Sequence, residues 1–167
     1  EEIDALADKV LWAYGDRRSI KASYTFGGSD FRPKGIKKGL VIQTGSHQYD
    51  FELKSIMLLL LHSGLKEGSA PYKWPTVSQR TRTLVKLARY CSHRGLRSFR
   101  ALESLPAMKL RTLLLGFLMD ETDKGGMNAG ALTSAYKTVR NAVKHLTDYG
   151  LVRRDDFMEM VDEFTLV

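Results

Sequence analysis

The chain has 167 residues, 43% of them hydrophobic, and a formal net charge of +7. This composition supports a buried core without a metal ion, and a single cysteine, Cys91, excludes an internal disulfide bond. No apolar run approaches the ~20 residues that a membrane-spanning helix needs, and no signal peptide is recognised, so we expect a cytoplasmic protein without a membrane partner.

Residues 1–62 predict a small N-terminal segment that combines short strands with one helix. Residues 3–14 fit either a short helix or a strand over 10–14, and residues 20–26 alternate weakly. Short strands are predicted at 39–43 and 48–51, on either side of a turn. A helix at 53–62 is apolar nearly all round and is therefore expected to be buried.

Residues 63–75 are predicted to be a linker, because the stretch SGLKEGSAPY is rich in glycine and serine. We therefore place a domain boundary there, followed by a helical domain over 76–167. The predicted elements of this domain are a helix from Thr76 or Ser78 to Ser92, a short helix or turn over 99–105, and helices over 106–120, 131–149 and 154–164.

Positive charge is concentrated in this helical part. Residues 73–150 carry fourteen basic and five acidic side chains, and no acidic residue lies between Glu67 and Glu103. A charge distribution of this sign favours a polyanionic partner. A solvated basic surface that only keeps the domain soluble is the alternative.

The helix predicted to end at Ser92 has one apolar and one basic face at the helical pitch. Its apolar stripe, which must face a core, consists of Val77, Leu84, Leu87, Ala88 and Cys91. Its opposite side carries Arg82, Lys86, Arg89 and His93. Like charges at these spacings repel each other by ~0.2–0.5 kcal/mol per pair, so stability does not explain them, whereas neutralisation of phosphates does.

The helix at 131–149 repeats this design. Its apolar stripe is Leu132, Ala135, Tyr136, Val139, Ala142, Val143 and Leu146. Its polar face is Thr133, Ser134, Lys137, Asn141, Lys144 and His145, with Arg140 at the edge. Such a mixture of cations, hydroxyls and amides can bond both phosphates and base edges, so the two helices together predict duplex DNA as the partner. For this helix alone, an ordinary exposed face is an equal alternative.

The helix between these two is predicted to be the buried centre of the bundle, because apolar side chains cover most of its circumference. Gly116 would let another helix approach closely. The alternative is a helix that exposes one side to another domain. Asp120, Glu121 and Asp123 at its end are interpreted as a solvated helix terminus rather than a metal site.

Two stretches, TVSQRTRTLVKLARYCSHRGLRSFRALES at 76–104 and ALTSAYKTVRNAVKHLTDYGL at 131–151, resemble the core-binding domain of the tyrosine recombinases, the phage integrase family. The first has a Thr/Ser-led helix, an aromatic residue near its end, a glycine and then Ser-Phe. The second ends in Tyr-Gly-Leu. Residues 49–61 resemble the β-containing segment and helix that precede this domain in some integrases. The resemblance covers about residues 73–152.

The resemblance implies a mainly α fold: a four- to five-helix, SAM-like bundle, preceded by a small β-containing segment, which forms half of a clamp around duplex DNA. It implies binding of the core site in DNA integration and recombination, self-association on DNA, and a prokaryotic or phage-encoded protein. The implied DNA-contact residues are Thr76, Ser78, Gln79, Arg82, Lys86, Arg89, Thr133, Lys137, Arg140, Asn141 and Lys144.

The chain departs from the family in its catalytic residues. No His-Xaa-Xaa-Arg is present, since His93 is followed by Arg94 and Arg97 but by no arginine at that spacing, and the Asn-Pro often found after the last helix is missing. One cysteine and four scattered histidines give no zinc pattern, and no Walker A loop or dinucleotide fingerprint occurs. We therefore expect a non-catalytic DNA-binding fragment without metal, cofactor or small-molecule ligand. A helical protein-interaction module or an RNA-binding regulatory module is the alternative.

Overall fold

The computed structural model describes residues 10–16, 19–25, 30–31, 40–62 and 72–166. Within these residues the fold is mainly α, with five α-helices packed together. The helices are α2 (His47–His62), α3 (Trp74–His93), α4 (Ala107–Lys124), α5 (Ala129–Asp148) and α6 (Phe157–Asp162), with short 3-10 turns η1 (Phe99–Glu103) and η2 (Glu163–Leu166). None of the described helices is long and apolar enough to cross a bilayer.

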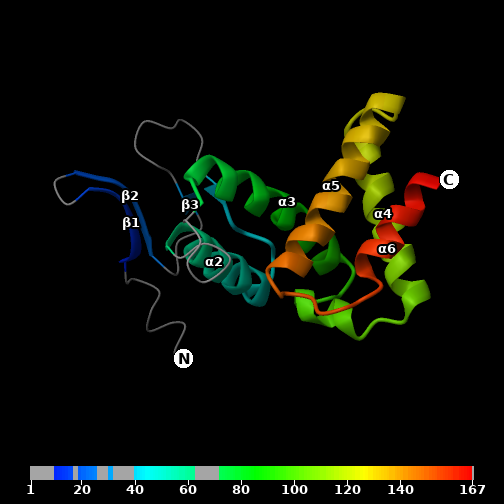
Figure 1. Ribbon diagram of the computed structural model, residues 1–167, viewed down its shortest axis with the longest axis horizontal. Coiled ribbons are helices and arrows are strands. Elements are labelled where there is room, and N and C mark those ends of the chain that lie inside the picture. The colour runs from blue at the N-terminus through cyan, green and yellow to red at the C-terminus, as the bar shows by residue number, and fades with distance from the viewer. Residues whose placement is uncertain (1–9, 17–18, 26–29, 32–39, 63–71, 167) are drawn as a thin grey trace.

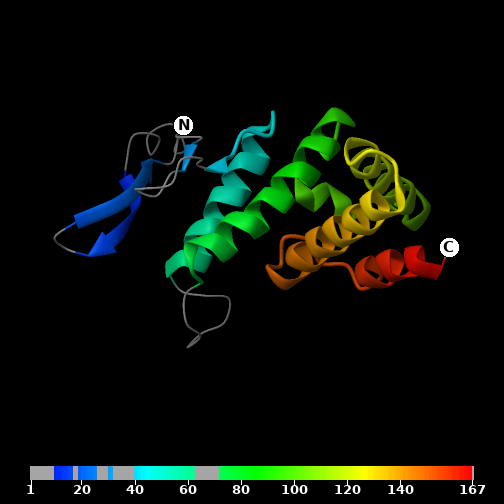
Figure 2. The same ribbon diagram turned by 90° about the horizontal axis from the view of Figure 1, so that it is seen from above.

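Among the described residues, four short strands precede the helices. β1 (Val10–Asp16) pairs antiparallel with β2 (Ser19–Thr25), and Trp12 lies opposite Tyr24. β3 (Asp30–Phe31) pairs antiparallel with β4 (Leu40–Val41). The β1–β2 hairpin lies at one end of the molecule and α4, α5 and α6 at the other, with α2 and α3 between them (Figure 1, Figure 2). The predictions for residues 3–9, 26, 39 and 63–71 lie outside the described residues.

The strand predicted at 48–51 is wrong, because α2 begins at His47. The side chain of Asp50, in the first turn of α2, accepts hydrogen bonds from Thr44 N at 2.9 Å and Thr44 Oγ1 at 2.7 Å. Tyr49 then falls on the buried stripe of the helix with Leu53 and Met57. The predicted helix at 53–62 is therefore the C-terminal part of a longer one, and its Leu59 is exposed.

Helix α2 shares one hydrophobic core with the helices that follow. Tyr49 donates a hydrogen bond from its hydroxyl to Leu96 O at 2.8 Å, and its ring packs edge-on against Phe99 with centroids 4.8 Å apart. After the predicted linker, Tyr72 N donates to Leu60 O at 2.9 Å. The described core residues between 42 and 62 thus pack against α3 in one hydrophobic core.

Helix α3 begins at Trp74, two residues before the predicted Thr76, and Pro75 lies in its first turn. Proline is tolerated there because its missing N–H has no partner within the helix. All five residues of the predicted apolar stripe are buried, which confirms that face. The helix ends before Gly95, whose φ of +81° suits a residue without a side chain.

Helix α4 is only partly buried, so the prediction that it is the buried centre of the bundle is wrong, and one of its sides is exposed, as in the alternative. Leu110, Leu114 and Phe117 face the core, but Met108 is 77% exposed and Leu115 and Met119 are also exposed. Apolar composition alone does not show which side of such a helix meets a neighbour. At Gly116 the space of a side chain is taken by Tyr90 of α3, since a Cβ there would lie 2.2 Å from Tyr90 Oη.

Helix α5 begins at Ala129 rather than 131, after an N-cap at which the Asn128 side chain accepts from Ala131 N at 2.8 Å. Its predicted apolar stripe is buried except for Tyr136, which is half-buried, and Leu132, which is 47% exposed. Leu132 lies in the first turn of α5. The predicted tail helix is shorter than 154–164 and is formed by α6, which buries Phe157 and Val161.

Arg154 joins the start of α6 to the turn between η1 and α4. Its guanidinium donates through Nη1 to the carbonyls of Leu102 at 3.0 Å, Glu103 at 3.4 Å and Leu105, and through Nε to Asp156 Oδ1 at 2.6 Å. The Arg154 side chain is only 13% exposed. The hydrogen bonds from Arg154 also hold the pKa of Asp156 below its usual value.

Candidate nucleic-acid interface

The basic stripe of α3 faces outward as predicted. Arg82, Lys86, Arg89 and His93 are all exposed. Arg89 Nε donates to Gln43 O at 3.1 Å, so the segment before α2 orients this side chain. Of the other predicted contact residues on α3, Gln79 is exposed and Thr76 partly exposed, whereas Ser78 is only 5% exposed. Ser78 therefore faces the core, and its side chain is not part of the surface.

The predicted contact residues of α5 are exposed but do not all lie together. These residues are Thr133, Lys137, Arg140, Asn141 and Lys144. Arg140 Nε lies 3.5 Å from Asp162 Oδ1 at the end of α6, so Arg140 is engaged on the α6 side of α5. Thr133 Oγ1 donates to Ala129 O at 3.0 Å within its own helix.

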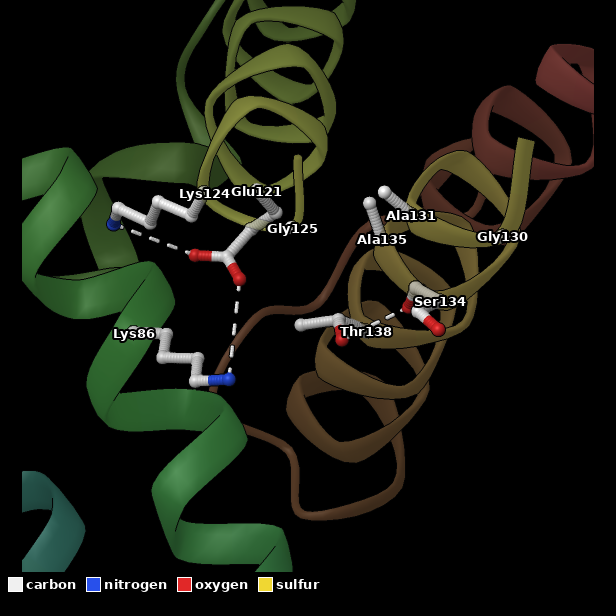
Figure 3. Close-up of a pocket in the computed structure, with 9 residues that line it drawn as sticks. All are labelled: Lys86, Glu121, Lys124, Gly125, Gly130, Ala131, Ser134, Ala135 and Thr138. Carbon is white, nitrogen blue, oxygen red and sulfur yellow. Dashed lines mark hydrogen bonds and ion pairs between the residues drawn. The ribbon is translucent and has the colours of Figure 1, made fainter. Parts of the chain in front are cut away.

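Two adjoining clefts, which we name together the basic groove, separate α3 from the end of α4 and the start of α5. The first, about 490 Å³, is lined by Lys86, Glu121, Lys124, Gly125, Gly130, Ala131, Ser134, Ala135 and Thr138 (Figure 3). The second, about 340 Å³, is lined by Lys86, Arg89, Tyr90, His93, Arg94, Asp120 and Lys124. Both clefts share Lys86 and Lys124, so the groove passes from the basic stripe of α3 to hydroxyl side chains of α5.

Acidic side chains from α4 enter this groove. Figure 3 shows Lys86 of α3 and Lys124 of α4 reaching the same Glu121 carboxylate, at 3.9 Å and 3.6 Å. Lys124 Nζ also lies 3.0 Å from Asp120 Oδ2. The Glu121 side chain is only 9% exposed, so the interpretation of this helix end as a solvated terminus is wrong for Glu121.

Among the groove residues that sequence reasoning did not predict as contacts are Lys124, Thr138 and Arg94. Lys124 and Thr138 come from helices whose packing the periodicity does not reveal. Arg94 lies just beyond α3, and its guanidinium stacks over the Tyr90 ring at 3.5 Å from the centroid. The signal available for Arg94 was its place in the acid-free stretch between Glu67 and Glu103.

His145 does not lie on the outer face of α5, where the sequence placed it. Its ring stacks on Tyr149, with centroids 5.7 Å apart and an interplanar angle of 10°. Tyr149 Oη accepts a hydrogen bond from Arg80 Nη1 at 3.1 Å, and Arg80 also lies over the Tyr72 ring. Burial, and then the positive charge of Arg80, lower the pKa of His145 to about 4.

We expect His145 to make the fold sensitive to acid. Because its pKa is about 4 in the folded chain and near 6.5 when unfolded, the unfolded chain binds more protons between these values. Stability should therefore fall by about 1–2 kcal/mol as the pH drops from 7 to 4.5, after allowance for partial exposure. Urea unfolding at both pH values should show a smaller loss for His145→Gln, whereas His93→Gln, at an exposed position, should behave as wild type. Equal losses in all three proteins would contradict this expectation.

Comparisons with known proteins found no match for this chain. No family model matches the chain, and neither a curated protein nor a solved structure matches it. Among the described residues, no group of three or more His, Cys, Asp or Glu side chains is placed to hold a metal ion. The electrostatics and shape of the basic groove are therefore the features from which a function has to be argued.

Proposed function

We propose that this chain binds duplex DNA through the basic groove and the flanking faces of α3 and α5. The observation that supports this most directly is that Lys86 and Arg89, from the basic stripe of α3, line the same groove as Ser134 and Thr138 of α5. Cations attract the phosphates, and the hydroxyls bond phosphates or base edges. In finer detail, we propose the core-site-binding part of a site-specific tyrosine recombinase, without catalysis by these residues.

Cations without a carboxylate partner, in the groove and on the flanking faces of α3 and α5, support this proposal. Within the part of the chain that the structure describes, Arg82, Arg89, Arg94 and Lys137 form no ion pair with a carboxylate. Exposed like charges on one surface lower the stability of the fold slightly, so their presence is explained better by binding of a polyanion than by folding. The proposed recombinase role rests on the resemblance of residues 76–104 and 131–151 to the core-binding domain.

A second candidate function, protein interaction, is favoured by one observation. Met108, Leu115 and Met119 are exposed on α4, and they follow one another at helical spacing. Exposed apolar side chains of this kind occur in interfaces between proteins. This surface lies on α4, outside the clefts that form the groove, so both functions are compatible with one fold.

Binding to a mixed-sequence 30-base-pair duplex across a series of salt concentrations tests the proposal. If four cations each contact one phosphate, log affinity should fall against log salt with a slope of about −3.6. An RNA hairpin of matched length should bind more weakly, because a helix face suits the DNA major groove better than that of RNA. Supercoiled plasmid should remain uncut. Absence of saturable binding at 50 mM salt, or a flat salt dependence, would refute the proposal, and preference for the hairpin would indicate an RNA-binding module.

A further inference from the structure

One nearly buried carboxylate on α4 lies between the ammonium groups of two different helices. Glu121 Oε2 lies 3.9 Å from Lys86 Nζ of α3, and Glu121 Oε1 lies 3.6 Å from Lys124 Nζ. The Glu121 side chain is 9% exposed, while those of Lys86 and Lys124 are 54% and 66% exposed. The carboxylate thus occupies the floor of the basic groove and the two lysines its rim (Figure 3).

With Asp120, this carboxylate balances the two lysines that both clefts share. Lys124 also pairs with Asp120 Oδ2 at 3.0 Å, so two cations meet two carboxylates at this place. These contacts raise the pKa of Lys124, in the first place through the hydrogen bond to Asp120. The middle of the groove therefore carries little net charge, whereas its end at Arg89 and Arg94 remains positive and its α5 side carries the hydroxyls of Ser134 and Thr138.

We propose that Glu121 is a specificity-determining residue of the groove, an inference that rests on the proposed DNA binding. A phosphate that approaches Lys86 must replace Glu121 as its partner and is repelled by the carboxylate below. The binding free energy gained at Lys86 is then small, and a duplex is retained only when Arg89 and Arg94 at one end of the groove and the hydroxyls of α5 at the other engage it together. Glu121 thereby weakens binding to polyanions that do not fit the whole surface.

Glu121→Gln keeps the size of the side chain and removes its charge. We expect this variant to bind a mixed-sequence 30-base-pair duplex about 3–10-fold more tightly than wild type at 100 mM salt, with the gain shrinking as salt rises. Asp120→Asn, which frees only Lys124, should give a smaller gain. Glu159→Gln makes the same charge change at an exposed position of α6, outside the groove, and should leave the affinity within about twofold of wild type.

A double-mutant cycle shows whether Glu121 acts through Lys86. In a Lys86→Met background, Glu121→Gln should tighten binding by less than about twofold, because one of the lysines that Glu121 neutralises is gone. Equal gains in both backgrounds would show an effect of net charge alone and would overturn the inference. If Glu121 only held α3 and α4 together, Glu121→Gln would lower the melting temperature and leave binding unchanged or weaker. That result would also overturn the inference.

The two proposals fail in different ways. If wild type shows no saturable binding to the duplex at low salt, the proposed function is refuted. If wild type binds and its affinity falls steeply with salt, but Glu121→Gln binds no more tightly, only the role of Glu121 is refuted.

Discussion

Reversing the charge of Arg82 on α3 and Lys137 on α5 together is expected to lower affinity for duplex DNA by at least about 100-fold, which corresponds to ~2.7 kcal/mol. Both side chains are exposed, and neither pairs with a carboxylate of the described residues. Each change removes a favourable phosphate contact and introduces a repulsive one. The circular dichroism spectrum and melting temperature should stay unchanged, because no core contact is lost.

The matched control separates this local effect from net charge. Lys109→Glu with Arg153→Glu makes the same total charge change at two exposed positions outside the groove. We expect this control to weaken binding by less than about tenfold, since charges beyond a Debye length are screened. Electrophoretic mobility shifts at 100 mM salt measure both doubles against wild type. If the two double variants lose affinity equally, the exposed faces of α3 and α5 have no special role in DNA binding.

Replacing Arg154 by methionine is expected to lower the free energy of unfolding by about 2–4 kcal/mol. Methionine fills much of the same space but leaves the carbonyls of Leu102, Glu103 and Leu105 without the guanidinium that satisfies them. It also removes the ion pair between the Arg154 guanidinium and the Asp156 carboxylate. Urea unfolding at neutral pH measures the loss.

Arg153 provides the control for this prediction. Its side chain is exposed, and its recorded hydrogen bond, to Glu103 Oε1 at 2.8 Å, comes from the backbone. Arg153→Met should therefore change stability by less than ~0.5 kcal/mol. Arg154→Lys should recover only part of the loss, because an ammonium group lacks the planar fork that reaches several carbonyls at once. A loss below ~1 kcal/mol in Arg154→Met would contradict the bracing role of this side chain.

The helical faces of α3 and α5 could be predicted because the 3.6-residue period directly separates buried from exposed positions. The same reasoning failed at residues 48–51, where Tyr49 and Phe51 alternate with polar residues over a stretch too short to separate the two periods, and which lie in α2 rather than in a strand. It also failed for α4, where apolar side chains on every side do not reveal which ones meet a neighbour.

The groove itself could not be predicted, because its residues meet only through packing between helices. Lys86 and Glu121 are 35 positions apart in the sequence, yet they form an ion pair. The stretch without acidic residues between Glu67 and Glu103 suggested an uninterrupted positive field, and the carboxylates that interrupt it come from the following long helix. Likewise, the engagement of Arg140 by Asp162 depends on where the chain returns after α5.

The common core of α2 and α3 limits how many residues can be removed from the N-terminal side of this chain. A fragment that starts at residue 76 would remove the Tyr49 ring from Phe99 and the Gln43 carbonyl from Arg89. The first loss uncovers the aromatic ring of Phe99 at the start of η1, and the second releases a guanidinium that lines the groove. A minimal unit that keeps both its buried core and its surface geometry must therefore extend upstream to include residue 42.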